Sequence, residues 1–537
     1  MEVSYREEGV ASAASSVAGR LVADGVPARL AGGDPTLWGE DAEAEAAVRL
    51  GWLTLPRSSR ELLPELGELA ERARAAGLTN VVLAGMGGSS LAAEVICDTA
   101  DVPLTVLDTT DPGQVRRALT EPLEATIVVV AGKSGSTVET DCHLRIYERL
   151  FADAGLAPAG RIVVVTDPGS PLEQRALDGG HHLFLAPPDV GGRYSALSAF
   201  GLVPSALAGA DVARLLDDAE EILPLLSRDT GNPGLDLGAA LGGSALAGRD
   251  KLLLEDQLSS ISGLPDWIEQ LVAESTGKQG RGILPIVGAD PTRAGDELVV
   301  AIESDGGDVR VDGPLGAQFL VWEYATAIAG LLIEIDPFDQ PNVAESKDNT
   351  ASLLALPDLP TGGPAFTDGP VEVYGAVTAK DLPGVFAELL RAVPGDGYLA
   401  ITAYLDRLAA FDAPVPDGAD FEQMTDAWMM ADPATLRALL ALRTDRPVTF
   451  GWGPRYLHST GQYHKGGPQN GVFLQITGAV AEDVPVPGRP YTLGRLQLAQ
   501  ALGDLGALET RGRPAVRLHL TDRVAGVAHL LAAAQEA

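Results

Sequence analysis

The chain has 537 residues, of which 46% are hydrophobic, and a formal net charge of −35 at pH 7. Such an acidic surface repels nucleic acid and anionic membranes, and no apolar run approaches the ~20 residues of a membrane helix, so we expect neither partner. Two cysteines cannot build a disulfide framework, and the charged N-terminus lacks the apolar segment of a signal peptide, so a cytoplasmic protein is expected.

Residues 1–55, rich in Ala and Glu, are predicted to form a helical extension. In residues 56–225, short apolar strands then alternate with helices, which predicts parallel sheets covered on both faces, with ligands at the carboxyl ends of the strands. The expected elements are helix 61–77, strand 80–84 with a turn at 85–90, helix 91–100, strand 103–111, strand 125–131 with a turn at 132–137, helix 138–155 and strand 161–170.

Two Pro- and Gly-rich stretches, residues 224–244 and 357–370, suggest boundaries in the rest of the chain. Strands are expected at 251–257, 283–290, 296–304, 371–377, 397–405, 448–452, 471–477 and 515–520, and helices at 264–276, 315–333, 380–392, 434–443, 495–507 and 522–535. We therefore predict an α/β fold of two three-layer αβα sandwiches with parallel sheets, at residues 56–225 and 226–356. A C-terminal α/β segment, residues 357–537, is expected to complete the second domain.

Two Gly/Ser turns follow predicted strands and open predicted helices: GMGGSS at residues 85–90 and GKSGST at residues 132–137. Glycines let the backbone approach an anion, and the N–H groups of a helix N-terminus attract it. A tight strand-to-helix turn needs glycine in any case, but two such turns on one sheet predict a phosphate site. Neither turn has the spacing of a dinucleotide-binding or Walker motif.

Glu274 lies among the apolar positions of the predicted helix 264–276, on one stripe with Trp267 and Leu271. Burial raises the pKa of a carboxyl group, which suits a general base working near neutral pH. The alternative is an ordinary salt bridge with Lys278, four residues further along the helix. Spacing alone favours this alternative.

Three other polar residues stand in short distinctive segments. Arg193 follows two glycines in GGRYSALSAFGL, and an arginine held in a tight turn often contacts an anion or a transition state. Lys347 ends PFDQPNVAESK, where a solvated surface lysine is the simpler interpretation. His458 and His464 lie in PRYLHSTGQYHKGG, but their spacing matches no zinc motif, so no metal site is expected.

The motifs GMGGSS, GKSGST, GGRYSALSAFGL, ESTGK and PFDQPNVAESK occur in this order and closely resemble the glucose-6-phosphate isomerase family. The first two are similar to the sugar-phosphate turns of its sugar isomerase (SIS) domains. RYLHSTGQYHKGGP is similar to the tail of the isomerase half of transaldolase–isomerase fusions. The resemblance implies two SIS-type sandwiches, a homodimer without metal or organic cofactor, and reversible isomerisation of glucose 6-phosphate and fructose 6-phosphate through a cis-enediol, in glycolysis and gluconeogenesis.

The same resemblance assigns roles to individual positions. Glu274 matches the base that moves the proton, Arg193 matches the arginine that stabilises the enediolate, and Lys347 matches a lysine that takes part in ring opening. The implied phosphate-binding group consists of Gly88, Ser89, Lys133, Ser134, Thr137 and Gln270.

Two positions depart from the family pattern. Family members carry a ring-opening histidine, contributed by the partner subunit, between the glutamate and FDQ motifs, but residues 275–336 contain no histidine. His458 is the best candidate for this role, whereas His464 has none. Gly132 stands where the family usually has serine, which removes one phosphate hydroxyl.

Two alternative functions remain open at this point. A dual glucose/mannose phosphate isomerase fits the same motifs. A non-catalytic SIS protein that senses sugar phosphates would keep the two serine turns but would need neither Glu274 nor Arg193, so the presence of both residues favours an enzyme.

Overall fold

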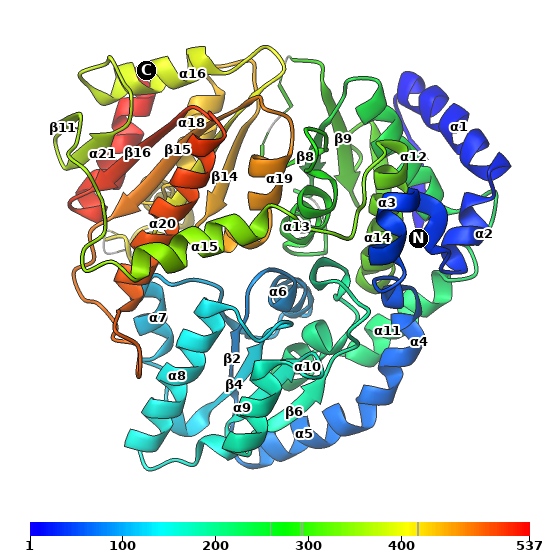
Figure 1. Cartoon of the computed structure of the whole chain (residues 1–537), viewed down its shortest axis with the longest axis horizontal. Helices are drawn as coiled ribbons and strands as arrows, with labels where there is room; N and C mark the ends of the chain where they lie inside the picture. Colours follow the sequence, from blue (N-terminus) through cyan, green and yellow to red (C-terminus); the bar gives the residue numbers. More distant parts are fainter. Residues whose placement is uncertain (258, 290, 293, 416–417) are drawn as a thin grey trace.

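In the computed structural model, the strands form three β-sheets, each covered by helices (Figure 1). The structure describes residues 1–257, 259–289, 291–292, 294–415 and 418–537, without the side chains of residues 343 and 344. Within these residues the sheets contain five, five and six strands, and most neighbouring strands are parallel. The predicted α/β class with mainly parallel sheets is therefore confirmed.

The first sheet is wholly parallel and has the strand order β3-β2-β4-β5-β6. Its strands are β2 (Asn80–Ala84), β3 (Thr105–Leu107), β4 (Thr126–Ala131), β5 (Ile162–Thr166) and β6 (His182–Leu185). Helices α5 (Leu63–Ala75), α6 (Leu91–Thr99) and α10 (Ala199–Ala208) pack on one face, and α7 (Pro112–Ala118), α8 (Val138–Asp153) and α9 (Pro171–Gly179) pack on the other. Because β2 and β4 are neighbours, the two Gly/Ser turns lie at the same edge of the sheet.

The second sheet has the order β1-β10-β9-β7-β8, with β1 antiparallel to β10. Its strands are β1 (Glu2–Tyr5), β7 (Lys251–Glu255), β8 (Leu284–Val287), β9 (Glu297–Ile302) and β10 (Val309–Asp312). The prediction that the first residues are helical was wrong for β1, because a four-residue edge strand is defined by a distant partner, Val309–Asp312, and no local pattern reports it. The following residues do form helices, α1 (Glu8–Ala23), α2 (Val26–Ala31), α3 (Glu40–Ala46) and α4 (Leu55–Ser58).

Helices α12 (Pro233–Leu246) and α14 (Leu315–Leu332) pack closely together against the second sheet, beside α11 (Val212–Ile222). A Cβ at Gly238 or Gly242 would lie 2.7 Å from Ile328 or 2.5 Å from Leu332, so glycine is required for this contact. Within the described residues, α14 alone has the length and apolar composition of a membrane span, and 89% of it is buried inside the protein. The sequence prediction did not count it as a long apolar run because polar residues interrupt it.

The third sheet belongs to the C-terminal segment and has the order β11-β12-β16-β15-β13-β14. Its strands are β11 (Phe366–Asp368), β12 (Val371–Tyr374), β13 (Tyr398–Tyr404), β14 (Val448–Trp452), β15 (Gly471–Gly478) and β16 (Ala515–Leu520). One face packs against α16 (Leu382–Ala392), α18 (Thr435–Ala441) and α21 (Arg523–Glu536). Helix α17 (Phe421–Met429) lies between β13 and β14 in the chain, and α19 (Gly461–Gly466) and α20 (Leu493–Thr510) follow β14 and β15.

The C-terminal segment thus has a sheet and a core of its own, and it also packs against the second sheet. Tyr398 and Phe473 of the third sheet share a buried cluster with Leu253 and Ile286 of the second. The predicted domain bounds stay predictions. Helices α13 (Leu264–Thr276) and α15 (Val343–Leu354) lie where the three sheets approach one another (Figure 1). Helix α13 carries Gln270 and Glu274, α15 carries Lys347, and the short helix η9 (Arg455–His458) carries His458.

Candidate active site

The first Gly/Ser turn lies against the loop that carries Arg193. Gly87–Ser89 form a short 3-10 helix at the carboxyl end of β2, and Ser89 is buried. A Cβ at Gly88 would lie 1.9 Å from the carbonyl oxygen of Gly192, so only glycine permits this approach. The turn therefore seats the arginine loop as well as presenting backbone N–H groups.

The second Gly/Ser turn leads into α8. The hydroxyls of Ser134 and Ser136 are 2.8 Å apart, and both side chains are exposed. Thr137 is the N-cap of α8, and among the described residues its side chain accepts no capping hydrogen bond. The first turn of α8 thus offers N–H groups and hydroxyls to an anion, as a helix N-terminus does.

Lys133 is held away from these hydroxyls by an ion pair. Its Nζ lies 2.5 Å from Oδ2 of Asp167 and 3.4 Å from the carbonyl oxygen of Pro188. Burial raises the pKa of Asp167, although the Lys133 ammonium acts in the opposite direction. The structure thus separates Lys133 from the other residues of the predicted phosphate group.

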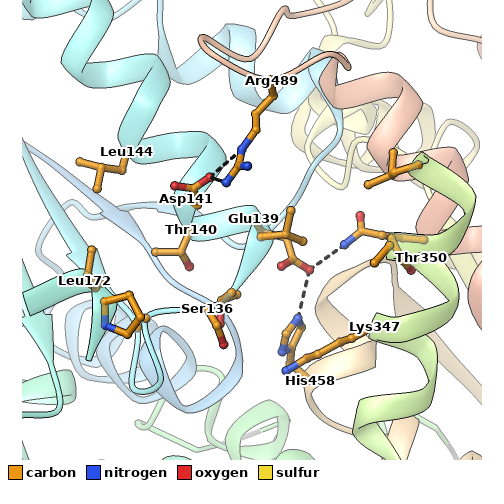
Figure 2. A pocket seen from close by; sticks show the side chains of 18 of the residues that line it. Ser136, Glu139, Thr140, Asp141, Leu144, Leu172, Lys347, Thr350, His458 and Arg489 are labelled. Atoms are coloured by element: carbon orange, nitrogen blue, oxygen red, sulfur yellow. Dashed lines mark hydrogen bonds and ion pairs between the residues drawn. The ribbon is translucent and has the colours of Figure 1, made fainter. Parts of the chain in front are cut away.

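A cavity of about 760 Å³ opens between α8, α9 and α15 (Figure 2). Residues from six separate segments of the chain line it, among them Ser136, Thr137, Glu139, Lys347, His458 and Gln500. The second turn, the lysine of the FDQ motif and the C-terminal histidine motif therefore share one space. Neither Glu274 nor Arg193 lines this cavity.

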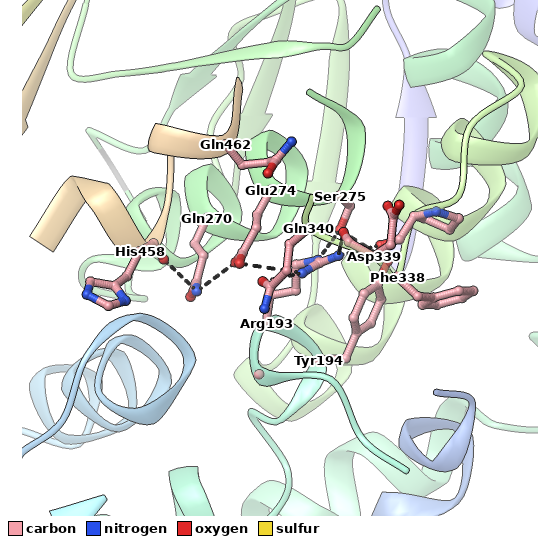
Figure 3. Close-up of polar contacts among 12 residues, drawn as sticks. Arg193, Tyr194, Gln270, Glu274, Ser275, Phe338, Asp339, Gln340, His458 and Gln462 are labelled. Atoms are coloured by element: carbon pink, nitrogen blue, oxygen red, sulfur yellow. Dashed lines mark hydrogen bonds and ion pairs between the residues drawn. The ribbon is translucent and has the colours of Figure 1, made fainter. Parts of the chain in front are cut away.

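Glu274 belongs to a buried polar series on the other side of His458 (Figure 3). Gln270, one helical turn earlier on α13, donates from Nε2 to Oε2 of Glu274 at 3.0 Å and to the backbone carbonyl of His458 at 2.9 Å. Gln270 Oε1 is buried without a partner within the described residues. A single amide group thus connects Glu274 to the histidine segment.

Arg193 is 3% exposed, and its guanidinium is surrounded by acceptors. Nε donates to Ser275 Oγ at 2.9 Å, and Nη2 donates to the backbone carbonyls of Pro337 and Asp339 at 2.9 and 2.8 Å. Nη1 lies 3.5 Å from Oε1 of Glu274. The backbone of the FDQ motif therefore fixes the planar guanidinium of Arg193 beside the carboxylate of Glu274.

The alternative salt bridge between Glu274 and Lys278 is absent from the described residues. Lys278 is fully buried and donates from Nζ to the carbonyl oxygen of Asp336 at 2.6 Å and to Oδ1 of Asp339 at 2.5 Å. Burial, assisted by nearby Arg193, lowers the pKa of Lys278 to about 8. Lys278 thus supports the FDQ loop, and Glu274 remains paired with Arg193 and Gln270.

His458 has a carboxylate partner that the sequence analysis did not identify. His458 Nε2 lies 3.1 Å from Oε1 of Glu139, which also accepts from Gln500 Nε2 at 2.7 Å. Burial by itself would raise the pKa of Glu139, but the facing imidazole outweighs it and lowers this pKa to about 2. The sequence could have indicated Glu139, because it is a carboxylate two residues after Thr137 of the predicted phosphate turn. No sequence feature indicated Gln500.

One buried carboxylate connects the segments that carry Lys347 and His458. Asp504 Oδ1 accepts from Ser346 Oγ at 3.0 Å, and Oδ2 accepts from Tyr456 OH at 2.6 Å. Lys347 itself is exposed to the cavity. Lys465 Nζ completes the arrangement at 2.7 Å from Oδ1 of Asp504.

Arg455 and His464, two other basic residues of the segment that carries His458, make structural contacts. Arg455 Nη1 lies 2.7 Å from Glu94 and 2.6 Å from Asp108, which joins the C-terminal segment to the first sheet. His464 is buried with its Nδ1 2.9 Å from the hydroxyl of Tyr398, and burial lowers its pKa to about 3. The structure thus separates the two histidines, with His458 at the cavity and His464 in the core.

Parallel strands that end in two Gly/hydroxyl turns, beside a paired glutamate and arginine, are the arrangement expected from the resemblance to sugar-phosphate isomerases. A sequence profile described as phosphoglucose isomerase matches residues 67–232. The probable glucose-6-phosphate isomerase of Natronomonas pharaonis is 32% identical over 344 residues, covering 57% of this chain and 79% of that protein. The chain belongs to the glucose-6-phosphate isomerase family.

Two further proteins are similar to this chain. The glucose-6-phosphate isomerase of Rubrobacter xylanophilus is 28% identical over 388 residues, covering 57% of this chain and 89% of that protein. The crystal structure of a hypothetical protein from Thermus thermophilus matches with a TM-score of 0.55 and 26% identity, covering 66% of this chain and 100% of that one.

Proposed function

We propose that this protein interconverts glucose 6-phosphate and fructose 6-phosphate through a cis-enediol, as a step of glycolysis and gluconeogenesis. The observation that supports this most directly is the buried series from Arg193 through Glu274 and Gln270 to the backbone of His458. Membership of the family supplies the substrate, because relatives are named glucose-6-phosphate isomerases.

The substrate phosphate binds at the second turn in this proposal. Ser134 and Thr137 donate hydroxyl hydrogen bonds, and the first-turn N–H groups of α8 face the anion. Ser89 and the backbone at Gly88 contribute from the first turn. Lys133 acts only through the local potential, because Asp167 holds its ammonium.

Ring opening is assigned to His458 and Lys347, which line one cavity. The contact of Nε2 with Glu139 orients the imidazole, so Nδ1 is the nitrogen left to exchange a proton with the sugar. Lys347 supplies an ammonium donor from α15.

Glu274 then moves the proton between C2 and C1. Arg193 stabilises the negative charge that develops on the enediolate, because Ser275, Pro337 and Asp339 fix its guanidinium beside the base. Gln270 holds the base in place and leaves Oε1 to accept a hydrogen bond from a sugar hydroxyl. No step of this proposal uses a metal or an organic cofactor.

We propose a cytoplasmic homodimer on the strength of the resemblance. His458, Glu274 and Lys347 approach one another within one chain, through the contacts of Gln270 and Asp504. In this proposal the dimer therefore does not supply the ring-opening histidine, and activity per chain stays constant when a dimer dissociates on dilution.

A coupled assay tests the proposal. Fructose 6-phosphate is supplied and formation of glucose 6-phosphate is followed, with and without EDTA, and mannose 6-phosphate is then offered. We expect turnover that EDTA does not reduce. Absence of product would favour the sugar-phosphate sensor, and loss of turnover in EDTA would contradict the metal-free mechanism. Turnover of mannose 6-phosphate would establish the dual isomerase.

A further inference from the structure

The two faces of the third sheet differ in chemistry. One face of β13, β15 and β16 is apolar and packs against α16, α18 and α21. The opposite face turns polar toward the carboxyl ends of the strands, where the side chains are Thr402, Tyr404, Gln475, Thr477, Arg517 and His519. Parallel sheets covered by helices on both faces are usually apolar on both, so this polarity needs a reason.

The polar side chains stand in register across neighbouring strands. Tyr404 of β13 pairs with Thr477 of β15, and Thr477 pairs with His519 of β16. These three residues line a second cavity, of about 460 Å³. One row of the sheet therefore forms a wall of the cavity.

The position of this cavity is the one at which open α/β sheets bind ligands. After β13 the chain adds β14 on one side, then returns to add β15 and β16 on the other side. The cavity lies at the carboxyl ends of β13 and β15, where the direction of winding changes. Ligands of such sheets bind outside the carboxyl ends of the strands at this point.

A buried cation lies beside the same wall. Arg517 is 2% exposed, and its guanidinium lies 3.7 Å from the ring centroid of Tyr374. It donates to Thr477 Oγ1 at 3.4 Å and to the carbonyl oxygen of Thr361 at 3.2 Å, both in cavity-lining residues. Burial lowers the pKa of Arg517. Tyr374 and Glu372 act against this lowering, but no carboxylate within the described residues lies at ion-pair distance from Arg517. The buried charge is therefore only partly compensated, and a bound anion would offset the remaining cost.

We propose that this second cavity binds a small oxyanion, either a phosphate ester or a carboxylate, at a site separate from the candidate active site. Arg495 and Asp358 both line the cavity, and Nη2 of Arg495 donates to the carbonyl oxygen of Leu356. The other N–H groups of Arg495 are donors suited to phosphate and carboxylate oxygens, and Arg517 adds positive charge behind the lining residues Thr361 and Thr477. The Thr477 hydroxyl and the His519 ring supply the neighbouring polar contacts.

Helix α20 connects the proposed site with the candidate active site. Arg495 and Gln497 line the second cavity, whereas Gln500 lines the first and donates to Glu139, the partner of His458. The helical rise from Arg495 to Gln500 is about 7.5 Å. An anion bound at the amino end of α20 thus lies within about two helical turns of Gln500, whose amide bonds the carboxylate partner of His458.

Calorimetric titration of the whole chain with orthophosphate and, separately, with succinate tests the proposal. Because exchange of buried Arg517 risks unfolding, the variants are Thr477→Val and Arg495→Ala, with exposed Arg391→Ala on α16 as the control for loss of one positive charge. We expect each variant, but not the control, to have an affinity for at least one of the two anions that is lower by at least about tenfold, which is about 1.4 kcal/mol.

The two titrants separate the two kinds of ligand. Weakened orthophosphate binding assigns a phosphate ester, and weakened succinate binding alone assigns a carboxylate. Equal binding of both anions by the chain and both variants would overturn the proposal, as would no binding of either anion. Phosphate bound at the second Gly/Ser turn is recognised because it persists in both variants, so failure of the proposed isomerase activity is distinguished from failure of this site.

Discussion

The two halves of the candidate active site differ in burial and in how firmly their side chains are held. Arg193, Gln270 and Glu274 are 3%, 3% and 6% exposed and bond to one another or to backbone. On the cavity side, Lys347 and Ser136 are exposed. In the proposed function, the buried half transfers the proton and the open half receives the substrate.

This difference agrees with the division of tasks in the proposed function. Proton transfer through an enediolate needs fixed charges in a water-poor place, and the buried half has them. Ring opening and phosphate binding need access for a hexose phosphate, and the cavity provides it. Loss of a buried group should therefore reduce turnover of every substrate, whereas loss of a cavity group should depend on the substrate.

The largest effect is expected for Glu274→Gln. The exchange keeps the shape of the side chain but removes the base, so kcat should fall by about 10²–10⁴-fold with little change in KM. Steady-state kinetics in both directions measure this. Glu269→Gln, at the neighbouring position before Gln270 on α13, is the matched control and should retain turnover. A near-normal kcat in Glu274→Gln would contradict the proposed role of the buried half in proton transfer.

The second largest loss of turnover is expected for Arg193→Lys. Lysine keeps the charge but loses the fork that bonds Ser275, Pro337 and Asp339, so charge stabilisation weakens and kcat should fall by about 10²–10³-fold. Thermal unfolding of the same variant checks that the protein remains folded. If kcat is retained, the guanidinium serves the FDQ loop and not the reaction.

His458→Ala separates the two halves. Turnover of cyclic substrate should fall by about 10²-fold, because acid–base assistance to ring opening is lost. A short-chain sugar phosphate that cannot close a pyranose ring should be used at nearly the normal rate. His529→Ala, far along the C-terminal segment, is the control, and an equal loss with both substrates would make His458 a structural residue.

Glu139→Gln tests the carboxylate that holds His458. A carboxyl whose pKa falls from 4.5 to about 2 on folding stabilises the protein above pH 4.5, and this contribution disappears as pH falls through 2. It amounts to at most about 3 kcal/mol. Urea unfolding should therefore show a difference between protein and variant that is full at about pH 6 and vanishes near pH 2. A pH-independent difference would show that the ion pair contributes nothing.

The smallest effect is expected for Lys133→Met. Because Asp167 holds this ammonium, its removal should change KM for the sugar phosphate by less than about threefold, in the range of a partly exposed ion pair. Thr137→Val in the same turn should raise KM more. If Lys133→Met has the larger effect, the lysine turns to the phosphate when substrate binds.

Sequence patterns predicted most of the third sheet correctly. Strands β14 and β16 occupy the expected residues 448–452 and 515–520, because alternating apolar side chains define them locally. Strands β1 and β10 were missed because they are short strands that pair with each other across more than half of the chain.

The candidate site was predictable where a motif carries it. Glu274, Arg193 and Lys347 were predicted as site residues through the resemblance of short motifs to the isomerase family, whereas spacing alone favoured a salt bridge for Glu274 and a surface position for Lys347. Glu139 and Gln500 contact each other beside His458 only because the tertiary fold brings α8 and α20 into one buried cluster, although the two residues are 361 apart in the chain. No local pattern reports such a contact.

The sequence by itself determined the α/β class, the two phosphate-type turns and the motifs of the isomerase family, because each depends on neighbouring residues. Only the tertiary structure decided that Glu274 pairs with Arg193 and not with Lys278, and that Asp167 holds Lys133 away from the turn. Electrostatic partners are chosen by distance and burial, which chain order does not contain. The same is true of His458, which reaches Gln270 and Glu139 because the third sheet packs against the other two.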